Sequence, residues 1–161
     1  MTTRGHIREP LGLVRDTSAV NLDERATAFL EKNHSAAMTT LRKDGSPHTV
    51  RVGLALVEGK LWSSGTKDRV RTKHLRRDPS CSLFVFDPGF GYLVLDTTVT
   101  ILEGPESIDQ SVTMFRLTQR RPSGPLQWFG GELSEEDFRR TLFDEGRLIY
   151  EFNVYRSSGL Y

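Results

Sequence analysis

The sequence predicts a mainly β fold: an antiparallel barrel of five or six strands with a few flanking helices. Two observations predict it. Short runs rich in Val, Thr, Leu and Phe are joined by turn sequences such as Asp44-Gly45 and Glu58-Gly59, which favour hairpins. Strands and helices do not alternate as in a βαβ domain, and neither GxGxxG nor GxxxxGK is present. A length of 161 residues suits one domain with a substantial core.

The first elements follow a polar segment. Residues 1–20 carry no periodic pattern and are expected to form an N-terminal arm, so the barrel domain is assigned to residues 21–161. Asn21 or Asp23 can cap a helix that runs to about Lys32. Three strands are expected next, at about 35–41, 49–57 and 60–64.

The second half begins with a basic helix at about residues 68–77, which Asp78-Pro79 ends. Two amphipathic helices are expected further on, and the second begins at a Ser134 cap and closes at Gly146. The remaining strands are expected at about 81–86, 92–103 and 147–155.

Composition excludes several classes of protein. The formal charge is only +1 and the basic helix lacks interleaved aromatic residues, which argues against nucleic-acid binding. No apolar run approaches the roughly 20 residues of a membrane span, and the first ten residues lack the apolar core of a signal peptide. Because Cys81 is the single cysteine, no internal disulfide is available and a cytoplasmic location is expected. The four histidines show no metal-ligand spacing.

The strongest local signal is the run from Lys67 to Arg77. Its eleven residues contain six Lys or Arg and one acid, a net charge of +5. In a nearly neutral chain, such a cluster indicates one site for an anionic ligand. The start of a helix suits phosphate because its first N–H groups are unpaired and its dipole end is positive.

Helical spacing separates the cations of this run. One row is expected to be solvated, and it consists of Arg69, Lys73 and Arg76. Arg71 instead falls between Val70 and Leu75, the two apolar side chains of the helix, with Lys67 nearby. Arg71 is therefore the best single candidate for a ligand contact.

Hydroxyl groups precede the basic helix. Ser63, Ser64 and Thr66 are expected to surround Gly65 in a compact turn that offers hydroxyl and N–H groups to an anion. Simple capping of the helix is the alternative interpretation.

The expected strand at 49–57 has an unusual face. Arg51, Gly53 and Ala55 are expected on one side of it, opposite the side that faces the core. Glycine inside a strand often marks close approach by a ligand or another chain. The alternative is a bulge or a crowded barrel interior.

Few residues suggest chemistry of their own. No Ser/His/Asp or Cys/His set is spaced as an activated nucleophile, so any reaction is expected to belong to a bound cofactor. Trp128 and Phe129 lie in a Pro/Gly-rich loop and need cover from a partner subunit, a ligand or the protein's own surface.

Four stretches resemble a known family. They are MTTLRKDGSP at 38–47, the strand around 52–57, LWSSGT at 61–66 and the basic run that ends in Arg77-Asp78-Pro79. Together they resemble the pyridoxamine 5′-phosphate oxidase-like superfamily of FMN-binding split barrels. They are most similar to its branch of coenzyme F420-dependent (deazaflavin) oxidoreductases of actinobacteria. The resemblance covers roughly Ala26 to Glu103.

The resemblance implies a six-stranded antiparallel split β-barrel with flanking helices, forming a homodimer with cofactor sites at the subunit interface. It also implies hydride transfer between cofactor and a small organic substrate, with no universal catalytic side chain. His74 stands where many relatives have asparagine. The residues expected at the cofactor are Arg51, Gly53, Ser64, Gly65, Thr66, Lys67, Arg71, Lys73 and His74.

Three classes of function are open at this point. An F420-dependent oxidoreductase is favoured, with an FMN-dependent reductase as its alternative. A non-catalytic binder of flavin, haem or another tetrapyrrole on the same barrel is second. A nucleic-acid-binding module is third, because the charge pattern disfavours it.

Overall fold

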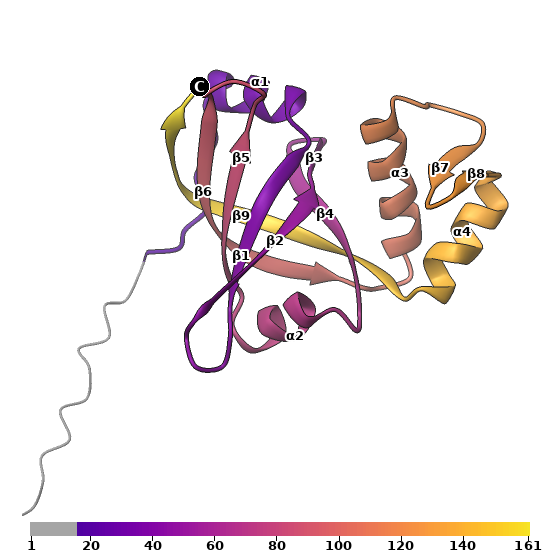
Figure 1. Ribbon diagram of the computed structural model, residues 1–161, viewed down its shortest axis with the longest axis horizontal. Coiled ribbons are helices and arrows are strands. Elements are labelled where there is room, and N and C mark those ends of the chain that lie inside the picture. The colour runs from indigo at the N-terminus through magenta and orange to yellow at the C-terminus, as the bar shows by residue number, and fades with distance from the viewer. Residues whose placement is uncertain (1–15) are drawn as a thin grey trace, which may run out of the picture.

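The computed structural model describes residues 16–161 and consists of one large sheet with helices at its ends and side (Figure 1). The elements up to residue 77 are α1 (Glu24–Lys32), β1 (Ser35–Leu41), β2 (Pro47–Gly53), β3 (Ala55–Val57), β4 (Lys60–Thr66) and α2 (Val70–Arg77). The later elements are β5 (Ser80–Phe86), β6 (Tyr92–Leu102), α3 (Ser107–Gln119), β7 (Leu126–Trp128), β8 (Gly131–Leu133), α4 (Glu135–Asp144) and β9 (Arg147–Leu160).

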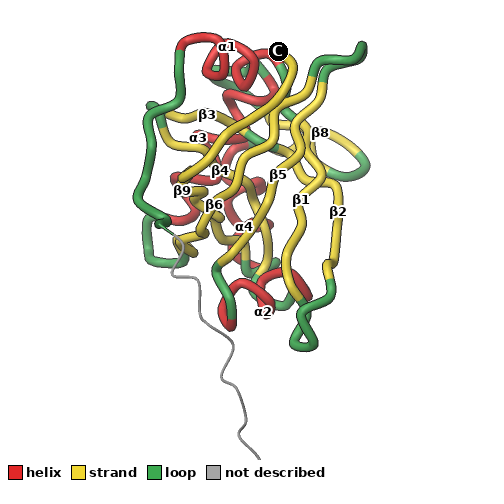
Figure 2. Tube along the Cα trace, turned by 90° about the vertical axis from the view of Figure 1, so that its left-hand side faces the viewer, coloured by secondary structure: helices red, strands yellow, loops and turns green. Residues whose placement is uncertain are grey.

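The main sheet is antiparallel and curled into a partial barrel. Its seven strands run in the order β2-β1-β5-β6-β9-β4-β3, and β2 contacts β4 across the opening of the curl. Figure 2 shows α1 and α2 at opposite ends of this barrel. The mainly β split-barrel class predicted from the sequence is therefore confirmed.

The predicted turns and caps set the order of these strands. Gly45 and Gly59 have positive φ values of 83° and 78° in the β1–β2 and β3–β4 turns, as the two turn sequences predict. The Asp23 side chain accepts a hydrogen bond from the Ala26 N–H at the start of α1, and Ser134 caps α4 in the same way.

The expected strand at 49–57 is two strands, which raises the count from six to seven. Leu54 interrupts it: its N–H donates to the His34 carbonyl at 2.8 Å, and its carbonyl lies 3.0 Å from the His34 ring. Before this break β2 pairs with β1, and after it β3 pairs with β4. The expectation that Ala55 shares a face with Arg51 and Gly53 is wrong, because Ala55 is buried beneath α3 with Met114.

A second difference concerns residues 121–131, which were expected to be a loop. They contain β7, and the short β7–β8 hairpin closes a helical lobe of residues 107–146 beside the barrel (Figure 1). Trp128 packs edge-on against Phe115 and Phe138, with ring centroids 5.1 and 5.2 Å away. The lobe itself thus covers Trp128, whereas Phe129 is 85% exposed.

The ends of the chain differ in how far they follow the sequence pattern. The last strand continues to Leu160, five residues beyond the expected end at Tyr155, because it stays paired with β6 through Ser158 and Leu160. Most of the expected N-terminal arm lies outside the described residues. At its end, the Val20 N–H donates to the Val154 carbonyl at 2.9 Å.

Candidate functional site

The hydroxyl-rich stretch and the basic run meet where β4 ends and α2 begins; we call residues 63–73 the β4–α2 corner. The predicted compact turn around Gly65 is absent, because β4 stays extended to Thr66 and pairs with β9 throughout. Helix α2 starts at Val70, two residues later than expected. The Thr72 hydroxyl donates to the Thr66 carbonyl at 2.7 Å and so fixes the helix start against the strand end.

The buried face of α2 differs from the face that apolar spacing predicts. Leu75 is buried as expected, but Val70 is 54% exposed. The other buried side chains are Thr72 and His74, and both are held by polar contacts. Hydrogen bonds therefore rotate the helix away from the orientation that its two apolar residues alone would give.

Arg71 nevertheless points partly into the protein. It is half-buried, and its guanidinium lies over the ring of Tyr150, 5.7 Å from the centroid. Its Nε is buried and has no hydrogen-bond partner within residues 16–161. A buried donor without a partner costs about 1–3 kcal/mol, so such groups usually have a use.

Two hydroxyl groups of β4 also lack a hydrogen-bond partner. The Oγ atoms of Ser63 and Ser64 are buried without a partner in the part of the chain that the structure describes. Ser63 pairs with Tyr150 on β9 and Ser64 with Ile149, so the two hydroxyls leave opposite faces of β4. The corner therefore holds three buried polar groups without a partner within residues 16–161, and Ser63 shares the face of β4 that carries Tyr150 and Arg71.

The cations of the corner lack acidic partners. Within residues 16–161, none of Lys67, Arg69, Arg71 and Lys73 forms an ion pair within 4.0 Å. Arg76, which follows on α2, is paired with Glu103 at 2.7 Å. The expected outward row of Arg69, Lys73 and Arg76 is exposed as predicted.

His74 lies on the opposite side of α2 from the solvated row. It is buried, and its Nδ1 lies 2.9 Å from the Thr40 hydroxyl on β1. Its ring meets that of His48 edge-on at 5.1 Å. Burial lowers the pKa of His74, and the neighbouring His48, Arg77 and Arg42 lower it further. These contacts assign His74 to the attachment of α2 to the barrel.

Arg51 and Gly53 lie on the outer face of β2. Arg51 pairs in register with Ala37, which pairs with Phe84, so these side chains share one face of the sheet. A Cβ atom built on Gly53 meets nothing closer than the His34 carbonyl at 3.8 Å. The fold around Gly53 therefore does not itself require glycine, unlike at Gly65.

That outer face continues into an exposed aromatic patch, made of Phe84, Phe86 and Tyr92. The rings stack at centroid distances of 6.0 Å (Phe84 to Phe86) and 5.4 Å (Phe84 to Tyr92). All three side chains are more than a third exposed.

A second site could involve the thiol of Cys81 or the potential metal ligands of residues 16–161. Cys81 is buried, and burial raises the pKa of its thiol to about 12, so it stays protonated near neutral pH. Within residues 16–161 no cluster of three potential metal ligands is found. None of the helices described is long and apolar enough to cross a membrane.

Sequence reasoning missed Tyr150 and Thr72, which join the two halves of the corner. Tyr150 was expected only as one residue of an alternating strand, and Thr72 as part of a basic helix. The available signal was Gly65, a glycine inside a strand. A Cβ atom there would lie 2.2 Å from the Tyr150 hydroxyl oxygen.

Comparison with known proteins places this fold in a family. The profile described as pyridoxamine 5′-phosphate oxidase matches residues 22–139. A conserved hypothetical protein from Mycobacterium tuberculosis has a TM-score of 0.67 at 17% identity, covering 91% of this chain and 88% of its own. An F420 reductase has a TM-score of 0.61 at 21% identity, covering 85% and 98%.

A third solved structure extends the range of these neighbours. An FAD-binding protein from Mesorhizobium loti has a TM-score of 0.53 at 17% identity, covering 86% of this chain and 94% of its own. At these identities the structural likeness concerns the fold. The profile match spans well over half of the sequence, and the chain belongs to the pyridoxamine 5′-phosphate oxidase family.

Proposed function

We propose that this protein is an oxidoreductase that binds a flavin-type cofactor, coenzyme F420 in preference to FMN, and reduces a small organic substrate. The observation that carries the proposal is the β4–α2 corner. It combines buried polar groups on Ser63, Ser64 and Arg71 that have no partner with cations that have no acidic partner, within residues 16–161. A phosphate bound beside Arg71 would accept from its unused donor and compensate the neighbouring cations.

The number of cations favours F420 over FMN. Lys67, Arg69, Arg71 and Lys73 lie within seven residues, and one phosphate needs fewer positive charges than these. F420 carries a phosphate and a further acidic tail, so it matches a longer cationic surface. The fold neighbour that is an F420 reductase is consistent with this choice.

The bound deazaflavin would supply the hydride, and the protein's own residues would bind and orient. Arg71 would hold the anionic end of the cofactor at the corner, with Ser63 on the same face of β4 as the Tyr150 ring beneath Arg71. The outer face of β2, with Arg51 and the open surface at Gly53, would support the ring end. Catalysis would then rest on positioning and electrostatics.

Ligand titration tests this proposal. Purified protein is mixed separately with F420, FMN and haem, and binding is followed by fluorescence quenching or by shifts in absorbance. We expect the tightest binding for F420. Micromolar binding of FMN without binding of F420 would assign the protein to flavin chemistry. Binding of haem alone would support the non-catalytic alternative.

We further propose that the protein is a homodimer whose second copy covers the outer aromatic patch. Three stacked and exposed rings beside Arg51 and Gly53 form an apolar surface that a second subunit would bury. Sedimentation should therefore give twice the chain mass of 18.3 kDa, and Phe84→Asp should shift it to the monomer. A wild-type monomer at micromolar concentration with cofactor present would contradict this proposal.

A further inference from the structure

Tyr150 connects the two halves of the β4–α2 corner from a third element. It lies on β9, is fully buried and pairs with Ser63 on β4. Its side chain crosses β4 over Gly65, where no Cβ atom is in the way. Its hydroxyl reaches the Thr72 hydroxyl on α2, and its ring lies under the Arg71 guanidinium.

The direction of the hydrogen bonds follows from the number of protons. The Thr72 hydroxyl has one hydrogen, and it donates this hydrogen to the Thr66 carbonyl. The bond between Thr72 and Tyr150 must then be donated by the phenol of Tyr150. A chain of donors thus runs from β9 through α2 to the end of β4.

This chain fixes the helix turn that carries Arg71. Thr72 is bonded on two sides, and Arg71 is its direct neighbour in the first turn of α2. The Tyr150 ring supports the guanidinium at 5.7 Å, within the range of a cation–π contact. The Nε of Arg71 remains without a partner within residues 16–161, so the contacts orient this side chain and leave a donor unused.

We propose that Tyr150 is a positioning residue, which holds Arg71 and the start of α2 in the geometry that binds the anionic end of the cofactor. The inference rests on the proposed function. If Tyr150 were purely structural, replacing it would lower the stability, or the affinity for every ligand alike. If Tyr150 is a positioning residue, replacing it lowers only the ratio of the affinity for a phosphate-bearing ligand to the affinity for the same ligand without phosphate.

Paired ligands measure that ratio. The pairs are FMN with riboflavin, and F420 with its phosphate-free chromophore. The variants are Tyr150→Phe, which keeps the ring and removes the donor, and Thr72→Val, which removes the acceptor. Tyr155→Phe is the matched control, because Tyr155 lies on β9 in a pocket that no residue of the β4–α2 corner lines. Thermal unfolding is recorded for each variant.

We expect both Tyr150→Phe and Thr72→Val to lower the affinity ratio of phosphate-bearing to phosphate-free ligand by about three- to tenfold, the range for one hydrogen bond. The affinity for the phosphate-free ligand should change less than twofold. In an Arg71→Ala background, Tyr150→Phe should have no further effect on the ratio, because Tyr150 acts through Arg71.

The results separate this inference from the proposed function. If the wild type binds the phosphate-bearing ligands but Tyr150→Phe leaves the ratio unchanged, or lowers both affinities equally, the positioning role is wrong and the proposed function stands. An undiminished effect of Tyr150→Phe in the Arg71→Ala background would also overturn it. If the wild type binds none of the four ligands, both proposals fail.

Discussion

Two regions of this protein are rich in arginine, and they differ in whether the guanidinium groups have acidic partners. In the helical lobe of residues 107–146, carboxylates pair with the guanidinium groups of Arg116, Arg121, Arg139 and Arg140. At the β4–α2 corner, within residues 16–161, four cations have no acid within 4.0 Å. Composition already points to this difference, because residues 67–77 hold six Lys or Arg and one acid, whereas residues 107–146 hold five Arg and seven Asp or Glu. The structure shows which of these charges are paired.

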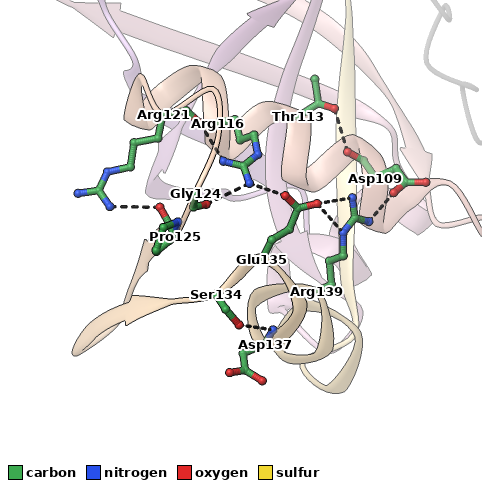
Figure 3. Close-up of polar contacts among 10 residues, drawn as sticks. All are labelled: Asp109, Thr113, Arg116, Arg121, Gly124, Pro125, Ser134, Glu135, Asp137 and Arg139. Carbon is green, nitrogen blue, oxygen red and sulfur yellow. Dashed lines mark hydrogen bonds and ion pairs between the residues drawn. The ribbon is translucent and has the colours of Figure 1, made fainter.

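Figure 3 shows the compensated case. Glu135 on α4 accepts bonds from Arg116 on α3 and from Arg139 on its own helix, and Arg139 also reaches Asp109. Arg116 further donates to the carbonyls of Arg121 and Gly124, which closes the loop before β7. The hydrogen bonds from these two arginines lower the pKa of Glu135. These arginines hold α3, α4 and the loop together.

The difference between the helical lobe and the β4–α2 corner shows which positive charges are available to a ligand. A guanidinium that is already satisfied by carboxylates contributes to stability and has little to gain from an added anion. One with a buried, unused N–H costs stability until something binds. Substitutions in the two regions should therefore have opposite consequences.

The largest effect is expected at Arg71. Arg71→Ala should weaken cofactor binding by roughly 1.5–3 kcal/mol, or about ten- to 150-fold, because a charge-assisted hydrogen bond is lost. The unfolding temperature should fall only by the contribution of the contact with the Tyr150 ring, since the Nε has no partner to lose within residues 16–161. The control is Arg76→Ala, whose guanidinium is exposed and paired with Glu103. Equal loss of affinity in both variants would show that α2 does not present Arg71 to the ligand.

The converse is expected at Arg116. Arg116→Ala should lower the free energy of unfolding by about 1–2 kcal/mol, because three bonds to a largely buried guanidinium are lost together. Cofactor affinity should stay within about a factor of two. Arg140→Ala is the matched control, since its pairs with Glu136 and Asp137 are exposed. Denaturant unfolding measures both variants, and loss of cofactor affinity in Arg116→Ala would remove the contrast.

A smaller loss of affinity is expected at Gly53. Gly53→Leu should lower cofactor affinity by about tenfold, because it places a side chain on the outer face where the ring is proposed to lie. The fold tolerates the change, as the nearest atom to a new Cβ is the His34 carbonyl at 3.8 Å. Lys43→Leu is the control, since Lys43 is an exposed residue of the β1–β2 turn, away from the outer face at Gly53, and has no positive φ. Normal affinity with Gly53→Leu would move the ring site off β2.

The sequence predicted the barrel class, the two hairpin turns and the caps of α1 and α4, because each depends on neighbours in the chain. It missed the break at Leu54, which depends on His34. The predicted orientation of α2 about its own axis was also wrong, because apolar spacing carries no information about the hydrogen bonds of Thr72 and His74. Tyr150 joins the corner from β9, about 80 positions after Thr66, and local patterns do not reveal such pairing.

Acid should loosen the attachment of α2 through His74. Its pKa is lowered mainly by burial, so the unfolded state binds a proton more readily than the folded state. The stability contribution is therefore intact above the ordinary value of 6.5 and is lost as the pH falls from there toward the folded-state pKa. His74→Asn should therefore flatten the pH dependence of the free energy of unfolding below pH 6.5, which denaturant unfolding at a series of pH values measures. Parallel curves for wild type and His74→Asn would contradict this assignment.

The smallest effects are expected from removing ionisable side chains as catalysts. If the reaction depends on positioning alone, changing His34, His48, His74 or Cys81 singly to alanine should cost far less than the factor of about 10²–10⁴ typical of a lost general acid or base. The contacts agree with this expectation: His34 binds the Leu54 carbonyl, His74 binds Thr40, and the Cys81 thiol, with a pKa of about 12, is protonated.

The measurement is steady-state oxidation of reduced F420 with a panel of quinones, enones and tetrapyrroles, with cofactor affinity measured on the same samples. His48 is the most informative variant, because its Nδ1 is buried without a partner within residues 16–161. If His48→Ala bound cofactor normally and lost a thousandfold in rate, that nitrogen would be the proton donor. The buried polar atoms without a hydrogen-bond partner would then include a catalytic group as well as groups that bind the ligand.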